Sequence, residues 1–212
     1  MITVTAFKWV PPAVQGLVCD LRVRWALEEA GMAYETILIG PDEQSRPDYR
    51  ARQPFGQVPV YEEDGLVLFE TGSIILHIGA RSRVLLPADE AAKARAVTWM
   101  FAALNSMWPS IQQLAVIDLF HAGEDWAASR RPAVEQAVRQ RLSELAAWLG
   151  DKAYLEGVFT AGDLMMTTVL RNLRHTGLVA AEPNLKAWLA RCEARPAFQR
   201  ALNGQMAVFE AA

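Results

Sequence analysis

The sequence predicts a mixed α/β unit with the element order βαβ–ββα, followed by an all-helical unit. Strand and helix patterns alternate through residue 80, and the segments beyond residue 87 all have helical periodicity. With 212 residues the chain is long enough for one large domain or two small ones. Its 52% apolar and 21% charged residues are typical of a globular protein.

The first elements follow from residue periodicity. Alternating apolar residues over 2–8 predict a half-buried strand, and two prolines and a glycine mark 9–16 as a loop. Apolar residues at helical spacing over 17–30 predict a helix that ends at Gly31, and 34–39 reads as a second strand. On the helix, Asp20, Arg24 and Glu28 are four residues apart, so we expect an ion-paired stripe facing water.

A hairpin follows a long polar segment. Residues 41–52 predict a loop or an irregular helix, and 58–61 and 66–69 predict two strands around an Asp-Gly turn. A helix is predicted over 71–80. The βαβ unit should be parallel, with the hairpin adding antiparallel strands at its other side.

The remaining chain predicts a helical bundle. Residues 1–82 are expected to form the first domain, 83–87 a linker and 88–212 an all-helical domain of about five helices, by the rules of loop length and periodicity. The helices are predicted over 91–120, 126–149, 160–176, 183–194 and 196–209. In the third of them, Thr160 and Asp163 have the spacing of a capping box, so we expect Asp163 to be structural and not a catalytic acid.

Composition excludes several classes of function. The 21 Lys and Arg against 24 Asp and Glu give a net charge of −3 without a dense basic patch, which argues against a nucleic-acid partner. No apolar run reaches the roughly 18–20 residues of a membrane span, and the first residues lack a signal-peptide pattern. Two cysteines do not make a disulfide framework, and the three histidines are isolated, so no metal site is expected. We expect a cytoplasmic protein.

Three segments carry a family resemblance. Residues 53–60 (QPFGQVPV) followed by 66–73 (LVLFETGS) resemble the glutathione-binding half of the glutathione transferase superfamily. Residues 21–31 are similar to the first helix of its cytosolic, bacterial-type, beta- and zeta-like members, and 159–163 (FTAGD) to a segment of its sixth helix. The resemblance implies a thioredoxin-like domain before a helical domain, a homodimer, and reduced glutathione as co-substrate for a small hydrophobic electrophile.

Two of these segments have a physical reason to bind a peptide-like ligand. A cis Val58-Pro59 bond, which costs about 0.5–1 kcal/mol, would turn the N–H and C=O of Val58 toward a ligand that pairs as an extra strand; the alternative is an ordinary turn. Thr71 is expected to cap the next helix, whose N-terminus attracts a carboxylate while Glu70 meets a neighbouring ammonium. Both charges occur at the γ-glutamyl end of glutathione. The alternative for Glu70 is a solvated side chain, and Gln57 either adds an amide contact or is solvated.

The catalytic group departs from the family pattern. Members of the superfamily place a Tyr, Ser or Cys after the first strand, whereas here no Ser precedes Ser45 and no Tyr precedes Tyr34. Cys19 stands where beta- and zeta-like members carry a cysteine, and a helix N-terminus can lower a thiol pKa. Alternatively, N–H groups of residues 17–19 stabilise a glutathione thiolate, with Cys19 inert.

The electrophile pocket is expected between two distant segments. Trp9 and Pro11 would form one side and Asn105 and Trp108 the other, although Trp108 could equally pack within the bundle. Three hypotheses therefore remain open: glutathione conjugation, a glutathione-dependent isomerase or thiol reductase using Cys19, and a non-catalytic binding or regulatory module.

Overall fold

The computed structural model describes residues 1–210, which fall into two compact units. The first holds Met1–Pro87 together with residues 195–210, and the second holds Ala88–Ala194. The sequence assigned 88–212 to one domain, so the structure differs in the place of the last helix, which packs within the first unit. No helix in the described part of the chain is both long and apolar enough to cross a membrane.

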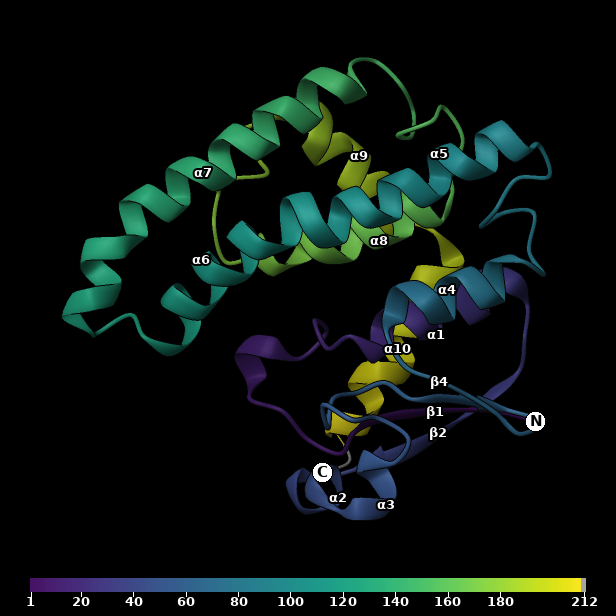
Figure 1. The fold of residues 1–212 in the computed structure, drawn as a ribbon. Coiled ribbons are helices and arrows are strands. Elements are labelled where there is room, and N and C mark those ends of the chain that lie inside the picture. Colours follow the sequence, from purple (N-terminus) through teal and green to yellow (C-terminus); the bar gives the residue numbers. More distant parts are fainter. Residues whose placement is uncertain (211–212) are drawn as a thin grey trace. The chain divides into compact units, whose positions relative to one another are not determined.

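A four-stranded mixed sheet forms the centre of the first unit (Figure 1). Its strands lie in the order β2 (Tyr34–Ile39), β1 (Ile2–Phe7), β3 (Tyr61–Glu63) and β4 (Leu66–Leu68). Strands β1 and β2 are parallel, whereas β3 is antiparallel to both β1 and β4. The predicted βαβ unit and hairpin are thus confirmed, although β3 begins three residues later than the predicted strand.

Helices α1 and α4 lie on one side of this sheet, and α2 and α3 on the other (Figure 1). The helices of the unit are α1 (Asp20–Ala30), α2 (Pro41–Ser45), α3 (Pro47–Arg50), α4 (Thr71–Gly79) and α10 (Pro196–Glu210), with a 3₁₀ turn, η1, at Pro12–Val14. Helix α1 ends as predicted at Gly31, whose φ of +66° suits glycine. Its start is later than predicted, because the Leu17 N–H donates to Val14 in the preceding turn.

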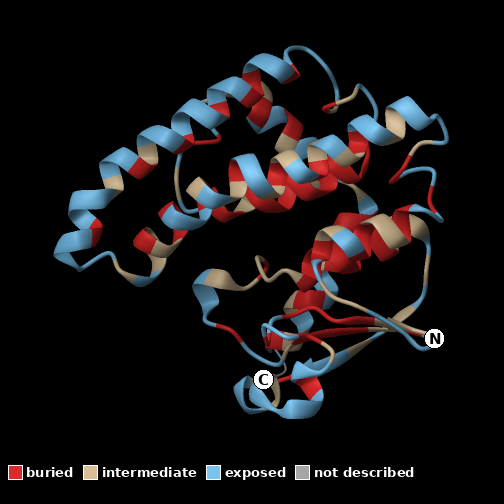
Figure 2. Cartoon of the chain, viewed as in Figure 1, coloured by how far each residue is buried: buried red, intermediate tan, exposed pale blue. Residues whose placement is uncertain are grey.

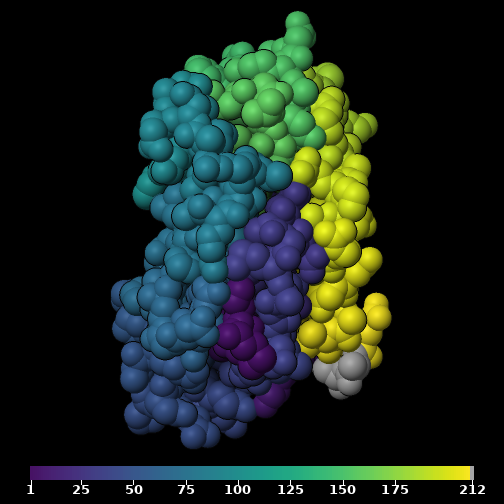
Figure 3. All heavy atoms as spheres, turned by 90° about the vertical axis from the view of Figure 1, so that its right-hand side faces the viewer, coloured from purple at the N-terminus to yellow at the C-terminus, as the bar shows by residue number. Residues whose placement is uncertain are grey.

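The ion-paired stripe on α1 does not face water. Asp20 and Arg24 are buried, since helix α10 packs against this face of α1. Arg24 Nε donates to Asp20 Oδ2 at 2.7 Å, so the pair is retained inside the unit. The expectation of a solvated stripe is therefore wrong for these two residues, and Figure 3 shows the yellow C-terminal segment against the purple and blue N-terminal one.

The second unit consists of helices. They are α5 (Glu90–Phe101), α6 (Trp108–Phe120), α7 (Asp125–Leu149), α8 (Ala161–Leu170) and α9 (Pro183–Glu193), with a π-helical segment η2 (Ala102–Met107) and a 3₁₀ turn η3 (Arg171–Leu173). The single helix predicted over 91–120 is interrupted at η2. Pro109 gives the reason, because it has no N–H to continue the i→i−4 pattern.

Helix α8 is buried along its whole length and forms the centre of the second unit (Figure 2). Its first turn is held by the capping box, in which Thr160 N–H donates to Asp163 Oδ2 at 3.0 Å and Thr160 Oγ1 accepts from Gly162 N. Asp163 Oδ1 also accepts from Leu155 N and Trp188 Nε1. Burial raises the pKa of Asp163, and its bonds lie inside the unit, consistent with a structural role.

Candidate functional site

The loop before β3 presents unpaired backbone groups. The Val58–Pro59 peptide bond is cis. Within residues 1–210, neither the N–H nor the C=O of Val58 has a hydrogen-bond partner. By contrast, both backbone groups of Val60, two residues further on, are paired with Thr5 of β1. The Val60 N–H donates to Thr5 Oγ1, and the Val60 C=O accepts from the Thr5 N–H. Val58 thus offers one donor and one acceptor at the edge of an otherwise paired segment.

A chain of hydroxyl groups holds this loop in place. The Val60 N–H donates to Thr5 Oγ1 at 2.7 Å, Thr5 Oγ1 lies 3.2 Å from the Tyr49 hydroxyl, and that hydroxyl donates to the Gln57 C=O at 2.6 Å. Burial raises the pKa of Tyr49, which keeps the phenol as a neutral donor. Neither Thr5 nor Tyr49 stands out in the sequence, where Thr5 is one of two threonines among the apolar residues of the first strand.

Gly56 makes the turn that brings residues 53–59 back to the sheet. Its φ is +64°, and a Cβ there would lie 2.6 Å from the guanidinium carbon of Arg50. The Gly56 C=O accepts from Gln44 Nε2 at 2.8 Å, and Arg50 Nη1 donates to the Pro54 C=O. The positive φ favours glycine at this position, and a Cβ would in addition require the end of the flexible Arg50 side chain to move.

Glu70, not Thr71, is the N-cap of helix α4. Its φ of +68° is rare for a residue other than glycine, and backbone strain of this kind is common at functional sites. Thr71 is the first helical residue, and its buried hydroxyl accepts from Arg22 Nη1 at 3.2 Å, so the predicted capping bond of Thr71 is wrong. The reason is that α1 brings a guanidinium to this hydroxyl.

The start of α4 has the features of an anion site. Its first intrahelical bond runs from Ile74 N to the Glu70 C=O, so the N–H groups of residues 71–73 have no intrahelical acceptor. The carboxylate of Glu70 is exposed directly before these donors. A ligand that carries adjacent carboxylate and ammonium groups therefore meets complementary charges at this one point of the chain.

The start of α1 lies beside the cis-proline loop. Val18 packs against a cluster that contains Val58, Val60 and Tyr49. Cys19 is the N-cap of α1, is partly exposed, and makes no capping hydrogen bond with its side chain. In the described chain the N–H groups of Val18 and Cys19 have no partner, whereas that of Leu17 is used by Val14. Two free donors and a thiol thus belong to the segment whose Val18 side chain packs against this cluster.

Comparisons with known proteins decide the family. The model of the glutathione S-transferase N-terminal domain matches residues 21–83, and that of the C-terminal domain matches 108–196. Glutathione S-transferase 3 of Zea mays is 31% identical over 195 residues, which cover 85% of this chain and 86% of the maize protein. The chain belongs to the glutathione transferase superfamily.

Other relatives agree with this assignment. Glutathione S-transferase 4 of Zea mays is 30% identical and covers 83% of each chain. The structure of glutathione transferase F7 from Populus trichocarpa has a TM-score of 0.82 at 22% identity, covering 97% of this chain and 99% of its own. A family member from Pseudomonas fluorescens, solved with two glutathione molecules bound, has a TM-score of 0.83 at 23% identity, covering 95% and 92%. The predicted fold class and enzyme class are confirmed.

The residues expected around an electrophile in this transferase belong to different units. Trp9 is 56% exposed, and Pro11 is also exposed, both in the first unit. Asn105 is exposed and Trp108 half-buried in the second, where Asn105 lines a groove that also includes Arg130. The shared pocket stays a prediction. Gln57 is exposed, and only its backbone C=O is used.

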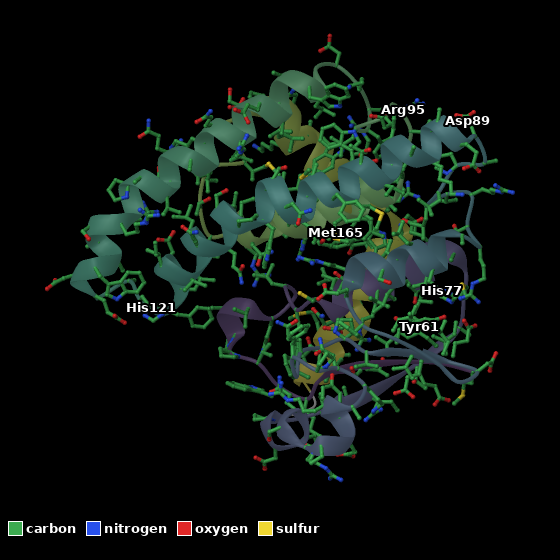
Figure 4. All side chains as sticks on the ribbon, in the orientation of Figure 1. Tyr61, His77, Asp89, Arg95, His121 and Met165 are labelled. Atoms are coloured by element: carbon green, nitrogen blue, oxygen red, sulfur yellow. The ribbon has the colours of Figure 1, made fainter. Side chains whose placement is uncertain are left out.

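A charged cluster of the transferase lies between the hairpin and α4. Figure 4 shows Tyr61 beside His77, and the Tyr61 hydroxyl donates to Glu63 Oε2 at 2.7 Å. Arg81 and Tyr61 lower the pKa of Glu63 to about 2, and burial and Glu63 raise the pKa of Tyr61 to about 12. These groups satisfy one another and connect two elements. Across residues 1–210, no group of three or more His, Cys, Asp or Glu is arranged to hold a metal ion.

Proposed function

We propose that this enzyme conjugates reduced glutathione to a small hydrophobic electrophile. The observation that carries the proposal is the set of unsatisfied groups gathered in the first unit: the N–H and C=O of Val58, the carboxylate of Glu70, and the N–H groups of residues 71–73. A tripeptide with a zwitterionic end has the complementary groups. Membership of the glutathione transferase superfamily supports the same ligand.

The γ-glutamyl end would bind at the start of α4. Its carboxylate would accept hydrogen bonds from N–H groups of residues 71–73, where the helix dipole is positive. Its ammonium would pair with the carboxylate of Glu70, an exposed residue directly before that turn. The cysteinyl part would pair with the backbone of Val58 as an added strand next to cis Pro59, and Gln57 would add an amide contact.

The thiol of the bound tripeptide would lie near the start of α1. The free N–H groups of Val18 and Cys19 would stabilise the thiolate, as fixed dipoles do for an anion that forms during reaction. Holding the thiolate close to the electrophile would then accelerate the conjugation further, because the two reactants are already in position. The exposed indole of Trp9 supports an apolar electrophile, with Pro11, Asn105 and Trp108 as the expected neighbours. The family resemblance supports a cytoplasmic homodimer.

One observation favours a second candidate function. Cys19 is a partly exposed residue at the N-cap of an eleven-residue helix, next to the proposed place of the glutathione thiol. Glutathione-dependent isomerisation or thiol reduction through Cys19 is therefore the alternative to conjugation. A non-catalytic module, the third hypothesis, predicts no turnover with any electrophile.

Calorimetric titration with reduced glutathione tests the ligand. Glu70→Gln should weaken binding by about tenfold or more, because it removes the charge that pairs with the ligand ammonium. Glu35→Gln, an equal change of charge at an exposed position on β2, is the matched control and should bind as the wild type does. Absence of wild-type binding, or equal weakening in both variants, contradicts the proposed site.

A further inference from the structure

Gln205 is a buried amide in the C-terminal helix that contacts the start of α1. Gln205 is only 1% exposed and lies on the face of α10 that packs against α1. Gln205 Nε2 donates to Asp20 Oδ1 at 2.7 Å and to the Val18 C=O at 3.3 Å. Both acceptors belong to the segment in which the free N–H groups lie.

The two bonds fall on either side of Cys19. One hydrogen of the amide reaches the residue before it and the other the residue after it, so a single side chain spans the N-cap. Cys19 itself has φ −63° and ψ −21°, continuing the helical path into the cap. A displacement of this segment would move both free N–H groups, because the Cys19 N–H shares a peptide group with the bonded C=O of Val18, and the Val18 N–H belongs to the same bonded residue.

This arrangement leaves a polar atom without a partner. Gln205 Oε1 is buried and makes no hydrogen bond within the described residues, and an unmade bond of a buried acceptor is unfavourable. An apolar side chain of the same size would fill the space without that cost. The carboxylate of Asp20 is already paired with Arg24 Nε, so Gln205 is not needed to neutralise its charge. The two hydrogen bonds that Gln205 donates therefore account for an amide at this buried position.

We propose that Gln205 is a positioning residue that holds the Val18–Cys19–Asp20 segment so that its free N–H groups face the glutathione thiolate. The inference rests on the proposed function and adds a C-terminal residue to the thiol-activating machinery. It assigns part of that machinery to the last helix, about 185 positions away in the chain.

The test compares Gln205→Met, which keeps the volume and removes both bonds, with Asn203→Ala, an exposed change on the same helix. Thiolate absorbance against pH, recorded with glutathione bound, gives the pKa of the bound thiol. For Gln205→Met we expect the pKa of the bound glutathione thiol to rise by about one unit. At a pH below that pKa, kcat/KM should fall about tenfold. The Kd of S-methylglutathione, which has no ionisable thiol, should change less than about twofold.

A second measurement reports the segment without any ligand. Amide hydrogen exchange at Leu21 and Arg22, whose N–H groups donate to the C=O groups of Val18 and Cys19, should be faster in Gln205→Met and unchanged in Asn203→Ala. If Gln205→Met does not fold, Gln205→Asn is compared with Asn203→Ala in its place, because the shorter side chain of asparagine cannot reach both acceptors.

The outcomes separate the two proposals. An unchanged pKa of the bound thiol in Gln205→Met overturns the inference, as does a parallel loss of S-methylglutathione affinity, which would indicate a general structural role. Failure of the wild-type protein to bind S-methylglutathione overturns the proposed function, and the positioning role with it. Normal wild-type binding with an unaltered thiol pKa in the variant overturns the positioning role alone.

Discussion

Glu70 shows how the structure can set a single residue apart in a way that its type does not reveal. Its positive φ is unfavourable for a side chain with a Cβ, and the surrounding structure must hold it there. Thr71 beside it is tied to Arg22, so the two residues of the pair have different roles: one presents a charge and the other joins two helices. The sequence analysis assigned the cap to Thr71, whereas the structure has Glu70 as the N-cap.

Cys19 can be tested at the same scale. If backbone N–H groups stabilise the glutathione thiolate, Cys19→Ala should retain kcat/KM within about twofold, because the alanine keeps the N–H and loses only the thiol. Steady-state kinetics over a panel of electrophiles, run with Cys19→Ser beside it, makes the measurement. Turnover that disappears in both variants while glutathione still binds would instead establish Cys19 as the nucleophile.

Individual elements differ in how far local sequence determines them. Helix α8 begins where the capping box predicts, because Thr160 and Asp163 lie within one turn and need no distant partner. Helix α1 begins three residues later than its periodicity predicts, and its charged stripe is covered by a helix from the end of the chain. Periodicity identifies a face but not what packs on it.

The cap of α8 gives a prediction at the element scale. Thr160→Ala should lower the free energy of unfolding by about 0.5–2 kcal/mol, because the Gly162 N–H loses its acceptor in a buried position. Urea denaturation followed by circular dichroism measures the change. Thr160→Ser, which keeps the hydroxyl, should lose less; a loss as large as that of Thr160→Ala would assign the effect to the methyl group rather than the cap.

Taken as a whole, the molecule brings the end of the chain back to its beginning. Helix α10 packs on α1, where the rings of Trp25 and Phe198 meet edge to face with centroids 4.8 Å apart. Arg195 pairs with Glu29 in the same contact, its Nε 2.6 Å from Oε1. The thioredoxin-like unit is therefore completed by residues that the sequence alone placed in the helical domain.

Truncation of one ring tests this packing. Phe198→Ala should lower the free energy of unfolding by about 3–5 kcal/mol, because it leaves a cavity beside the buried Trp25. Tryptophan fluorescence during urea denaturation reports the loss, and Asn203→Ala should show almost none. A cost below about 1 kcal/mol for Phe198→Ala would mean that α10 contributes little to the stability of the first unit.

Local patterns determined a large part of this protein. Strands β1 and β2, the glycine that ends α1 and the cap of α8 depend on neighbours within a few residues, so periodicity and motif spacing were sufficient for them. The predicted roles of Glu70 and Val58 depended in addition on the family resemblance of the segments around them. The strong order of the motifs along the chain also led to the family that the comparisons show.

Tertiary structure decided the contacts between distant segments. Thr5 and Tyr49 meet at the cis-proline loop, Arg22 meets Thr71, and Gln205 meets the start of α1, all across separations that no spacing rule describes. The physical reason is that burial and hydrogen bonding depend on which surfaces the whole chain packs together. Whether the charged stripe on α1 is solvated or buried depends on the packing of α10, a helix from the other end of the chain.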